Sequence, residues 1–345
     1  MSLHSEIQEQ PGCLERLLQK QRSTVEEIAR RINASDIRFV FVAARGTSEN
    51  AGRYANYLWG AMNGLPVALA APSLFTYYNR PPNLQGGFVV GISQSGRSPD
   101  IVSVLAEGKR QGCLTLAITN SIQSPLANAA DFVLDIGAGE ENAVAATKTY
   151  TSELMAIAMV SASMTGDGNR WQELFELPVS IQHALNGHCD YDGIVQRFHS
   201  ITKCVVLGRG FNYATAYEWA LKLKELTYVE AQPYSSADFL HGPIATVDGA
   251  FPVLAVVPGG AVCESILDVL RKLRSERKTE LVVISDVRDA MELAQTAIPM
   301  PDGIPEWLSP LVSIVPAQLF CYHLALAKGC DTESSRGIHK VTETR

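Results

Sequence analysis

The chain has 345 residues, which is enough for two domains of ordinary size, and 46% of them are hydrophobic while 19% are charged. This balance is typical of a folded globular protein and excludes an intrinsically disordered one. The formal net charge of −7 argues against binding to nucleic acid or to an anionic membrane surface. An anionic ligand must therefore be bound locally, by backbone amides and hydroxyl groups.

Seven cysteines are scattered along the chain, and none is in Cys-x-x-Cys spacing. This pattern predicts neither a disulfide framework nor a zinc site, and it favours a reducing cytoplasm. We expect no signal peptide, because the N-terminus lacks a charged segment followed by an apolar one. The longest apolar runs, 154–164 and 311–327, are expected to be buried helices, since the first is too short for a membrane span and the second contains Pro316 and His323.

The first 165 residues predict strands that alternate with helices. The expected strands are 37–43, 67–70, 88–92, 114–118 and 132–134, and the expected helices are 5–33 (as one or two), 49–62, 99–111, 123–129 and 143–164. This alternation predicts a three-layer α/β/α fold of the flavodoxin-like kind, with a parallel sheet covered by helices on both faces.

The same order recurs 164 residues further along the chain, where residues 205–210 repeat 41–46 and residues 253–260 repeat 89–96. Two matches at one offset predict an internal duplication, and therefore two similar α/β domains. The expected parts are N-terminal helices at 1–35, a first domain at 36–165, a second domain at 181–328 and a tail at 329–345, with a Gly- and Pro-containing linker between the two domains.

A ligand site is predicted where the strand 88–92 ends. The chain turns there into Ser93-Gln94-Ser95-Gly96, and a helix starts near Pro99. Backbone N–H groups at a helix start, the helix dipole and the hydroxyls of this turn and of Ser98 together favour an anion. An ordinary polar loop is the alternative interpretation. The absence of a lysine after the glycine excludes the nucleotide P-loop pattern.

The second copy has Val257-Pro258-Gly259-Gly260 at the place of this turn, without hydroxyl groups. We therefore expect a single phosphate site, in the first domain.

Two features of the second half indicate acid–base chemistry. Glu218, Lys222 and Glu225 are spaced at i, i+4 and i+7 and so share one face of the helix expected at 213–228. A solvent-exposed ion pair is the simpler interpretation, but the helix is otherwise apolar, and a buried charged stripe indicates a function. His241 precedes a Gly-Pro turn and has a side chain suited to proton transfer near neutral pH; a structural role is the alternative.

Six short motifs occur in a fixed order along the chain. They are Gly46-Thr47-Ser48, Ser93-Gln94-Ser95-Gly96, Glu141 with Ala145-Ala146-Thr147-Lys148, Ala220-Leu221-Lys222-Leu223-Lys224-Glu225, His241-Gly242-Pro243, and Arg336 with Lys340. Together they resemble the sugar isomerase (SIS) superfamily, and within it the group that contains the isomerase domain of glucosamine-6-phosphate synthase and stand-alone glucosamine-6-phosphate deaminases. The resemblance extends over almost the whole chain.

The resemblance implies a binding site for a sugar phosphate. In this family the Ser-Gln-Ser-Gly loop and the hydroxyl residue after it hold the phosphate, and the Gly-Thr-Ser turn contacts the substrate. The positions that this assigns to the binding of substrate are Gly46, Thr47, Ser48, Ser93, Gln94, Ser95, Ser98, Val144, Ala146 and His339.

The resemblance also implies the catalytic residues. It assigns the proton transfer between C1 and C2 to Glu225, with Glu218 and Lys222 in support. It assigns ring opening to His241, supplied by the partner subunit of a homodimer whose active site is shared. Lys340 would form a Schiff base with the open-chain ketose. Neither a metal nor an organic cofactor is expected.

The chain departs from the family pattern at several positions. Arg45 replaces the usual cysteine, Arg97 replaces an acidic residue, and Ala146 replaces a serine. The chain also starts in the isomerase part, so no glutaminase activity is expected. The two arginines add positive charge beside the phosphate loop, where they would tighten anion binding or accept a second charged group.

The expected reaction converts glucosamine 6-phosphate and water to fructose 6-phosphate and ammonia. The alternatives are a deglycase acting on a phosphorylated fructosamine, another ketose/aldose-phosphate isomerase, and a non-catalytic sensor of sugar phosphates. The presence of Glu225, His241 and Lys340 argues against the sensor, which does not need them.

Overall fold

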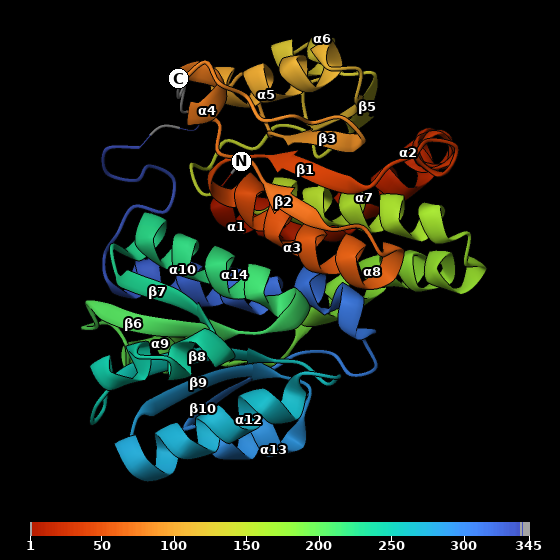
Figure 1. Cartoon of the computed structure of the whole chain (residues 1–345). Helices are drawn as coiled ribbons and strands as arrows, with labels where there is room; N and C mark the ends of the chain where they lie inside the picture. The colour runs from red at the N-terminus through yellow and green to blue at the C-terminus, as the bar shows by residue number, and fades with distance from the viewer. Residues whose placement is uncertain (1, 339, 341–345) are drawn as a thin grey trace. The chain divides into compact units, whose positions relative to one another are not determined.

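The computed structural model of the protein describes residues 2–338 and Lys340. It divides into two compact units (Figure 1). Of the described residues, the N-terminal unit contains 9–141, 146–178, Ile338 and Lys340, and the C-terminal unit contains 2–8, 142–145 and 179–337.

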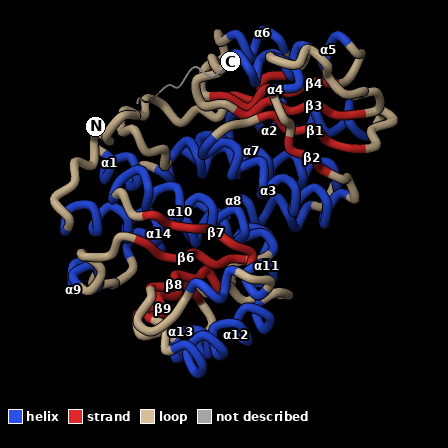
Figure 2. Tube along the Cα trace, turned by 60° about the vertical axis from the view of Figure 1, so that its left-hand side comes forward, coloured by secondary structure: helices blue, strands red, loops and turns tan. Residues whose placement is uncertain are grey.

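The N-terminal unit is built on a parallel sheet of five strands in the order β2-β1-β3-β4-β5. These strands are β1 (Phe39–Ala43), β2 (Val67–Leu69), β3 (Gly87–Ile92), β4 (Leu114–Thr119) and β5 (Phe132–Asp135). Figure 2 shows β1 to β4 side by side in this unit. The central strand β3 is buried at all six positions, as its unbroken apolar sequence requires.

Helices cover both faces of this sheet. One layer contains α2 (Gln10–Asn33), α3 (Gly46–Asn63) and α7 (Lys148–Thr165), and the other contains α4 (Ser73–Thr76), α5 (Pro99–Arg110) and α6 (Pro125–Ala129) (Figure 1). Helix α7 packs against both α2 and α3 and is buried over most of its length. It therefore belongs to the core of the unit.

The C-terminal unit has a second parallel sheet of five strands. Its strands are β6 (Lys203–Gly208), β7 (Glu230–Ser235), β8 (Pro252–Val257), β9 (Glu280–Ser285) and β10 (Thr296–Pro299), in the order β10-β9-β8-β6-β7. Its helices are α1 (Leu3–Gln8), α9 (Tyr191–Gln196), α10 (Tyr213–Thr227), α11 (Ser236–Leu240), α12 (Cys263–Lys272), α13 (Arg288–Leu293) and α14 (Ser309–Ala327). Short 3₁₀ turns lie at Gly210–Asn212, Pro243–Thr246 and Glu306–Leu308, and a π-helical turn at Leu273–Arg277.

The two sheets have the same topology, which confirms the predicted duplication and fold class. Numbered within each unit, both follow the order 2-1-3-4-5, which is that of flavodoxin-like folds. The first strand of each unit ends in the same turn, because Gly46 and Gly210 have φ angles of +54° and +60°. Each glycine follows an extended arginine, Arg45 or Arg209, so even the backbone of the turn is repeated.

Several elements of the structure differ from the sequence-based expectation. Helix α7 begins at Lys148 and not at residue 143, because the preceding residues form an irregular loop around the carboxylate of Glu141. The segment predicted as a linker is mostly helix α8 (Gly168–Asn186), with Pro178 inside it. Strand β7 was not predicted, since it contains Pro233 and lacks an apolar run; it lies at the edge of the sheet, where proline is tolerated.

One helical segment of the described chain, 306–327, is long and apolar enough to cross a membrane. However, 78% of its most apolar window is buried inside the protein. This is the pattern of a core helix, as predicted for residues 311–327.

Candidate functional site

The loop that follows β3 runs from residue 93 to 98 and leads into α5. It folds around its own hydroxyls: the Gly96 N–H donates to the carbonyl and to Oγ of Ser93, each at 3.2 Å, and the Arg97 N–H donates to Ser95 Oγ at 3.3 Å. Gly96 has a φ of +62°, and a Cβ at this position would lie 2.1 Å from Ser124 Oγ. The turn therefore requires glycine, and it presents Ser93–Ser98 at a helix N-terminus, which suits an anion.

The turn that carries Thr47 lies at the same edge of the sheet as this loop. The strands β1 and β3 are parallel neighbours, with Ala43 opposite Gly91. The other neighbour of β1 is β2, so the strand order reverses at β1. Open α/β sheets bind ligands outside the carboxyl ends of the strands at such a switch point. The two predicted binding segments of the N-terminal unit thus share the position at which this fold binds ligands.

Thr47 and Ser48 both lie in the first turn of α3, but their environments differ. Ser48 is buried, and its Oγ donates to Glu153 Oε1 of α7 at 2.8 Å. Thr47 is only partly buried. The hydroxyl of Ser48 already donates its hydrogen bond to Glu153. Thr47 is therefore the better candidate for a contact with the ligand.

Arg45 is paired with a buried carboxylate beside the loop. Its Nε lies 2.9 Å from Oδ2 of Asp100, which is in the first turn of α5. The side chain of Asp100 is 0% exposed and that of Arg45 is 46% exposed. Asp100 therefore fixes the guanidinium of Arg45 close to the start of α5. Arg97 is exposed, and its guanidinium has neither a hydrogen bond nor an ion pair within the described part of the chain.

Lys340 contacts the loop before α7. Its Nζ lies 2.6 Å from Oε2 of Glu141. Ala146, in the same loop, is partly exposed, as is Val144. Of the predicted binding residues, His339 lies outside the part of the chain that the structure describes.

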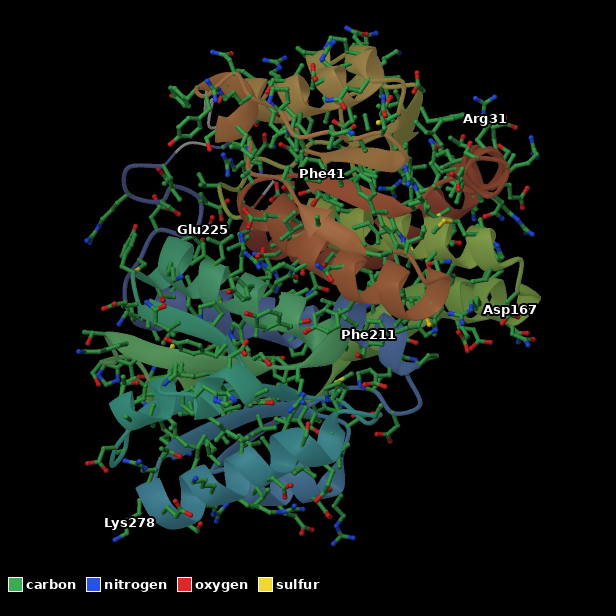
Figure 3. All side chains as sticks on the ribbon, in the orientation of Figure 1. Arg31, Phe41, Asp167, Phe211, Glu225 and Lys278 are labelled. Atoms are coloured by element: carbon green, nitrogen blue, oxygen red, sulfur yellow. The ribbon has the colours of Figure 1, made fainter. Side chains whose placement is uncertain are left out.

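The charged stripe of α10 is a buried ion-pair network in the C-terminal unit. Lys222 Nζ lies 3.3 Å from Glu218 Oε1 and 2.5 Å from Glu225 Oε2. The side chains of Glu218 and Lys222 are 0% and 1% exposed, whereas that of Glu225 is 21% exposed. Glu225 lies near the C-terminal end of α10 (Figure 3). The interpretation as a solvent-exposed ion pair is therefore wrong, and Glu225 is the member of the network that reaches solvent.

The charge of Lys222 is stabilised by its two neighbours. Burial alone would lower the pKa of this amine, but the carboxylates of Glu218 and Glu225 outweigh burial and raise the pKa well above its ordinary value. Lys222 is therefore an ammonium ion at neutral pH. It holds the Glu225 carboxylate in a fixed orientation, which is what a general base requires.

His241 follows the short helix α11 and is exposed. Its backbone N–H donates to the Asp238 carbonyl at 3.0 Å, and its ring makes no hydrogen bond within the described residues. The next residue, Gly242, has a φ of +128°. The turn thus presents the imidazole on the surface of its own unit.

The loop after β8 occupies the position in the second domain that the loop 93–98 has in the first, but acidic side chains already occupy it. The Gly259 N–H donates to Asp286 Oδ1 at 2.8 Å, and the Ala261 N–H donates to Glu306 Oε2 at 2.9 Å. A Cβ on Gly260 would lie 2.5 Å from the same Glu306 oxygen. These carboxylates take the backbone donors that an anion would need and repel negative charge.

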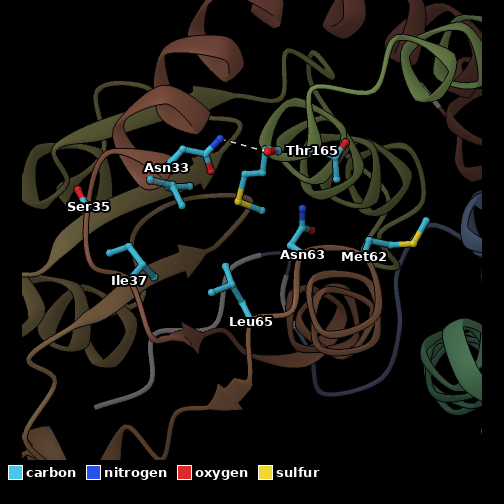
Figure 4. A pocket seen from close by; sticks show the side chains of 9 residues that line it. Asn33, Ser35, Ile37, Met62, Asn63, Leu65 and Thr165 are labelled. Carbon is cyan, nitrogen blue, oxygen red and sulfur yellow. Dashed lines mark hydrogen bonds between the residues drawn. The ribbon is translucent and has the colours of Figure 1, made fainter.

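A pocket of about 330 Å³ lies elsewhere in the N-terminal unit (Figure 4). It is lined by Ile32, Asn33, Ser35, Ile37, Met62, Asn63, Leu65, Met164 and Thr165. Ile37 and Leu65 precede β1 and β2, so the pocket is at the amino edge of the sheet, opposite the phosphate loop. None of its side chains titrates near neutral pH, and Asn33 Nδ2 is bonded to the Met164 carbonyl at 3.1 Å. We therefore assign no chemistry to it.

Comparison with known proteins now places the chain in a family. The model of the SIS domain matches it twice, over residues 35–163 and 198–328. The chain belongs to the SIS domain family. Each match coincides with one of the two repeated sheets, so the chain contains two SIS domains.

Several proteins are similar to this double-SIS chain. Glutamine–fructose-6-phosphate aminotransferase [isomerizing] of Gloeobacter violaceus is 32% identical over 97% of the chain and 57% of its own length. The chain thus spans about half the length of the curated relatives it matches. A protein of Silicibacter pomeroyi DSS-3 assigned as a phosphosugar isomerase superposes with a TM-score of 0.87 at 30% identity, covering 96% of this chain and 100% of that one. The C-terminal domain of glucosamine-fructose-6-phosphate aminotransferase from Francisella tularensis gives 0.85 at 27% identity, covering 96% and 98%.

Sequence reasoning missed two buried acids of the first SIS domain. Asp100 and Glu141 were not selected, although each holds a residue that was discussed, Arg45 or Lys340. A signal was present for both: Asp100 is an acidic residue at the start of a helix, and Glu141 opens the third of the six motifs, before α7. The sequence could not show the partner of either acid. Arg45 is 55 residues from Asp100, and Lys340 is 199 residues from Glu141.

Proposed function

We propose that this double-SIS protein is a phosphosugar isomerase of the deaminase type, converting glucosamine 6-phosphate and water to fructose 6-phosphate and ammonia. The observation that carries the proposal is the buried Glu218–Lys222–Glu225 network, in which only Glu225 is substantially exposed. A carboxylate oriented by a buried ammonium ion suits the removal of a proton next to a carbonyl or imine. A protein that only binds sugars has no need of it.

The phosphate of the substrate is assigned to the loop 93–98. Gln94, Ser95 and Ser98 are partly exposed there, and Ser93 and Gly96 shape the turn. The dipole of α5 favours the phosphate dianion at this place. Holding the phosphate, which does not react, uses remote binding energy to orient the carbons that do.

The proposed reaction proceeds in balanced steps. The C1 hydroxyl loses its proton while His241 protonates the ring oxygen, which opens the pyranose to the C1 aldehyde. Glu225 removes the C2 proton and returns it at C1, which moves the double bond to C2. The resulting ketimine adds water and releases ammonia, leaving fructose 6-phosphate. In a route through Lys340, the lysine amine displaces ammonia from the ketimine, and water then hydrolyses the lysine Schiff base to the same ketose and the free amine.

A homodimer with a shared active site is part of the proposal. It is supported by the exposed imidazole of His241, which has no hydrogen-bonding partner within the described residues. Mixed dimers of two inactive variants, Glu225→Gln and His241→Ala, are expected to regain activity, because one site in each hybrid has both residues intact. No recovery after verified subunit exchange would assign His241 to the site of its own chain.

The decisive assay measures ammonia release from a panel of amino-sugar 6-phosphates, with fructosamine 6-phosphates included. Ammonia from glucosamine 6-phosphate supports the proposal. No turnover of any amino sugar would contradict it.

A deglycase is the second candidate, and the exposed guanidinium of Arg97 beside the phosphate loop favours it. A fructosamine formed from an amino acid carries a carboxylate that such a cation would attract. Release of the amino acid together with a hexose 6-phosphate, without ammonia, would identify this activity in the same panel.

A further inference from the structure

The loop before α7 is organised around the carboxylate of Glu141. The side chain is fully buried, with 0% exposure. Its Oε1 accepts the N–H groups of Thr147 at 2.9 Å and Thr149 at 3.2 Å, and its Oε2 accepts the Thr149 hydroxyl at 2.7 Å. Three donors from the start of α7 therefore fix both oxygens of this carboxylate.

A fourth donor reaches Glu141 from the C-terminal tail. Lys340 Nζ lies 2.6 Å from Oε2, although the two residues are 199 positions apart in sequence. Burial alone would raise the pKa of Glu141, but the charge of Lys340 and the hydrogen bonds outweigh it and lower the pKa below its ordinary value. At neutral pH this is thus a buried carboxylate bound to an ammonium group that is only partly exposed.

We propose that Glu141 is a positioning residue. It holds the amine of Lys340 at the loop before α7 (residues 141–147). This inference rests on the proposed function, in which Lys340 reacts with the open-chain sugar. The loop that Glu141 organises also contains Ala146, one of the positions that the family resemblance assigns to the substrate. Glu141 does not touch the sugar; it acts through Lys340, whose ammonium group must first give a proton to solvent water before the free amine adds to the carbonyl and water leaves.

Physical chemistry gives this contact a purpose. A lysine on its four-carbon stem samples many positions, so its amine would only rarely meet the carbonyl of a bound sugar. A carboxylate that is itself fixed by three backbone and hydroxyl donors reduces these positions to a narrow range. The alternative, that Glu141 serves only to shape the start of α7, would leave the pairing with Lys340 without effect on the tail.

Limited trypsinolysis tests the docking without any assumption about activity. Trypsin cleaves after Lys340, and we expect the native protein to be protected there, with Glu141→Gln cleaved about tenfold faster, because a hydrogen bond between charged groups is lost. Thr149→Val is the matched control: it removes one hydrogen bond to Glu141 but keeps the ion pair, so cleavage should stay at the native rate. Equal cleavage of Glu141→Gln and the native protein would overturn the proposal.

Borohydride trapping tests the consequence for chemistry. Native protein incubated with fructose 6-phosphate and reduced should carry a covalent adduct at Lys340, measurable by mass spectrometry. Glu141→Gln should form it about tenfold more slowly while its affinity for inorganic phosphate is unchanged. An unchanged rate of adduct formation would overturn the positioning role.

The variant Lys340→Arg separates the ion pair with Glu141 from the Schiff-base chemistry of Lys340. It keeps a cation for Glu141, and trypsin still cleaves after arginine, so this variant should be protected at position 340 but form no adduct. The double variant Glu141→Gln/Lys340→Arg should lose the protection. If the native protein forms no adduct, the role of Lys340 in the proposed function is wrong, and the cleavage rates still decide whether Glu141 holds the tail.

Discussion

The loops that follow the third strands of the two SIS domains differ in chemistry. After β3 the loop carries hydroxyl groups at the start of α5. After β8 the loop donates its N–H groups to Asp286 and Glu306 of its own domain. The order of the strands has been kept in both domains, and we expect the side chains that fill each loop to decide whether an external anion can enter. Similarity of fold therefore does not predict a second phosphate site.

The first turns of the two domains combine a repeated backbone with different residues in the helices that follow. Arg45-Gly46 and Arg209-Gly210 have nearly the same backbone, but the helices that follow differ. Helix α3 brings Thr47 into its first turn, whereas α10 carries the buried ion-pair network that ends at Glu225. In the proposed function, the first copy binds the phosphate and the second transfers the proton.

The largest effect is expected for Glu225→Gln, which removes the base from α10 and keeps its shape. Turnover of glucosamine 6-phosphate should fall by about 10² or more while KM changes little, because the phosphate loop is untouched. Exchange of the C2 hydrogen with solvent deuterium, followed by NMR, should stop. Glu230→Gln, an exposed carboxylate on β7, is the control. Near-native turnover and exchange in Glu225→Gln would show that α10 has only a structural role.

Ser95→Ala should affect binding rather than turnover. A hydrogen bond to a charged phosphate oxygen is worth about 1.5–3 kcal/mol, so KM should rise about tenfold or more at nearly constant kcat. Titration with inorganic phosphate should show the same loss. An unchanged phosphate affinity would place the anion outside the loop 93–98.

Arg45→Ala tests whether the first turn of the N-terminal domain contributes to phosphate binding. Arg209→Ala changes the corresponding residue of the other domain and is the matched control. Removing Arg45 leaves the carboxylate of Asp100 uncompensated at the start of α5, where it repels a phosphate. Because Arg45 is nearly half exposed, the loss of phosphate affinity should be only about two- to fivefold and should shrink at high salt. Arg209→Ala should have no effect on phosphate. Equal effects of the two variants would contradict a specific role of Arg45.

The smallest effect is expected for Glu306→Ala, which frees the Ala261 N–H in the second loop. A crystal of this variant in concentrated phosphate should show a weakly occupied anion at residues 258–262, in addition to the one at the first loop. Asp286 still repels it, so the affinity stays low. An empty second loop in the variant would show that Glu306 is not what excludes the anion.

The fold and the position of the loop 93–98 in the first SIS domain could be predicted from the sequence, because both depend on local patterns. Apolar runs such as 88–92 have the length of buried strands, and the change from them to Ser93 and Gly96 marks a turn. Strands β7 and β10 were missed because edge strands need no apolar run, and α8 was missed because Gly166, Gly168 and Pro178 resemble a linker. Proline at this position is accommodated inside the helix.

The candidate site was predictable in its residue types but not in its pairings. The spacing of Glu218, Lys222 and Glu225 placed them on one helix face, and the structure confirms that they contact one another. The hydrogen bond from Ser48 to Glu153 joins α3 to α7, so a pattern within one segment of sequence could not predict it. Likewise, the role of Asp100 becomes visible only when β1 and α5 are packed together.

The carboxylate of Glu306 in the second loop has a consequence for inhibition kinetics. A group tethered to the same chain competes at a high effective concentration, on the order of millimolar or above, so free phosphate in solution is outcompeted there. We therefore expect each chain to have one class of sites for inorganic phosphate. Phosphate should inhibit as a simple competitor of the sugar phosphate, with a linear dependence of the apparent KM on its concentration.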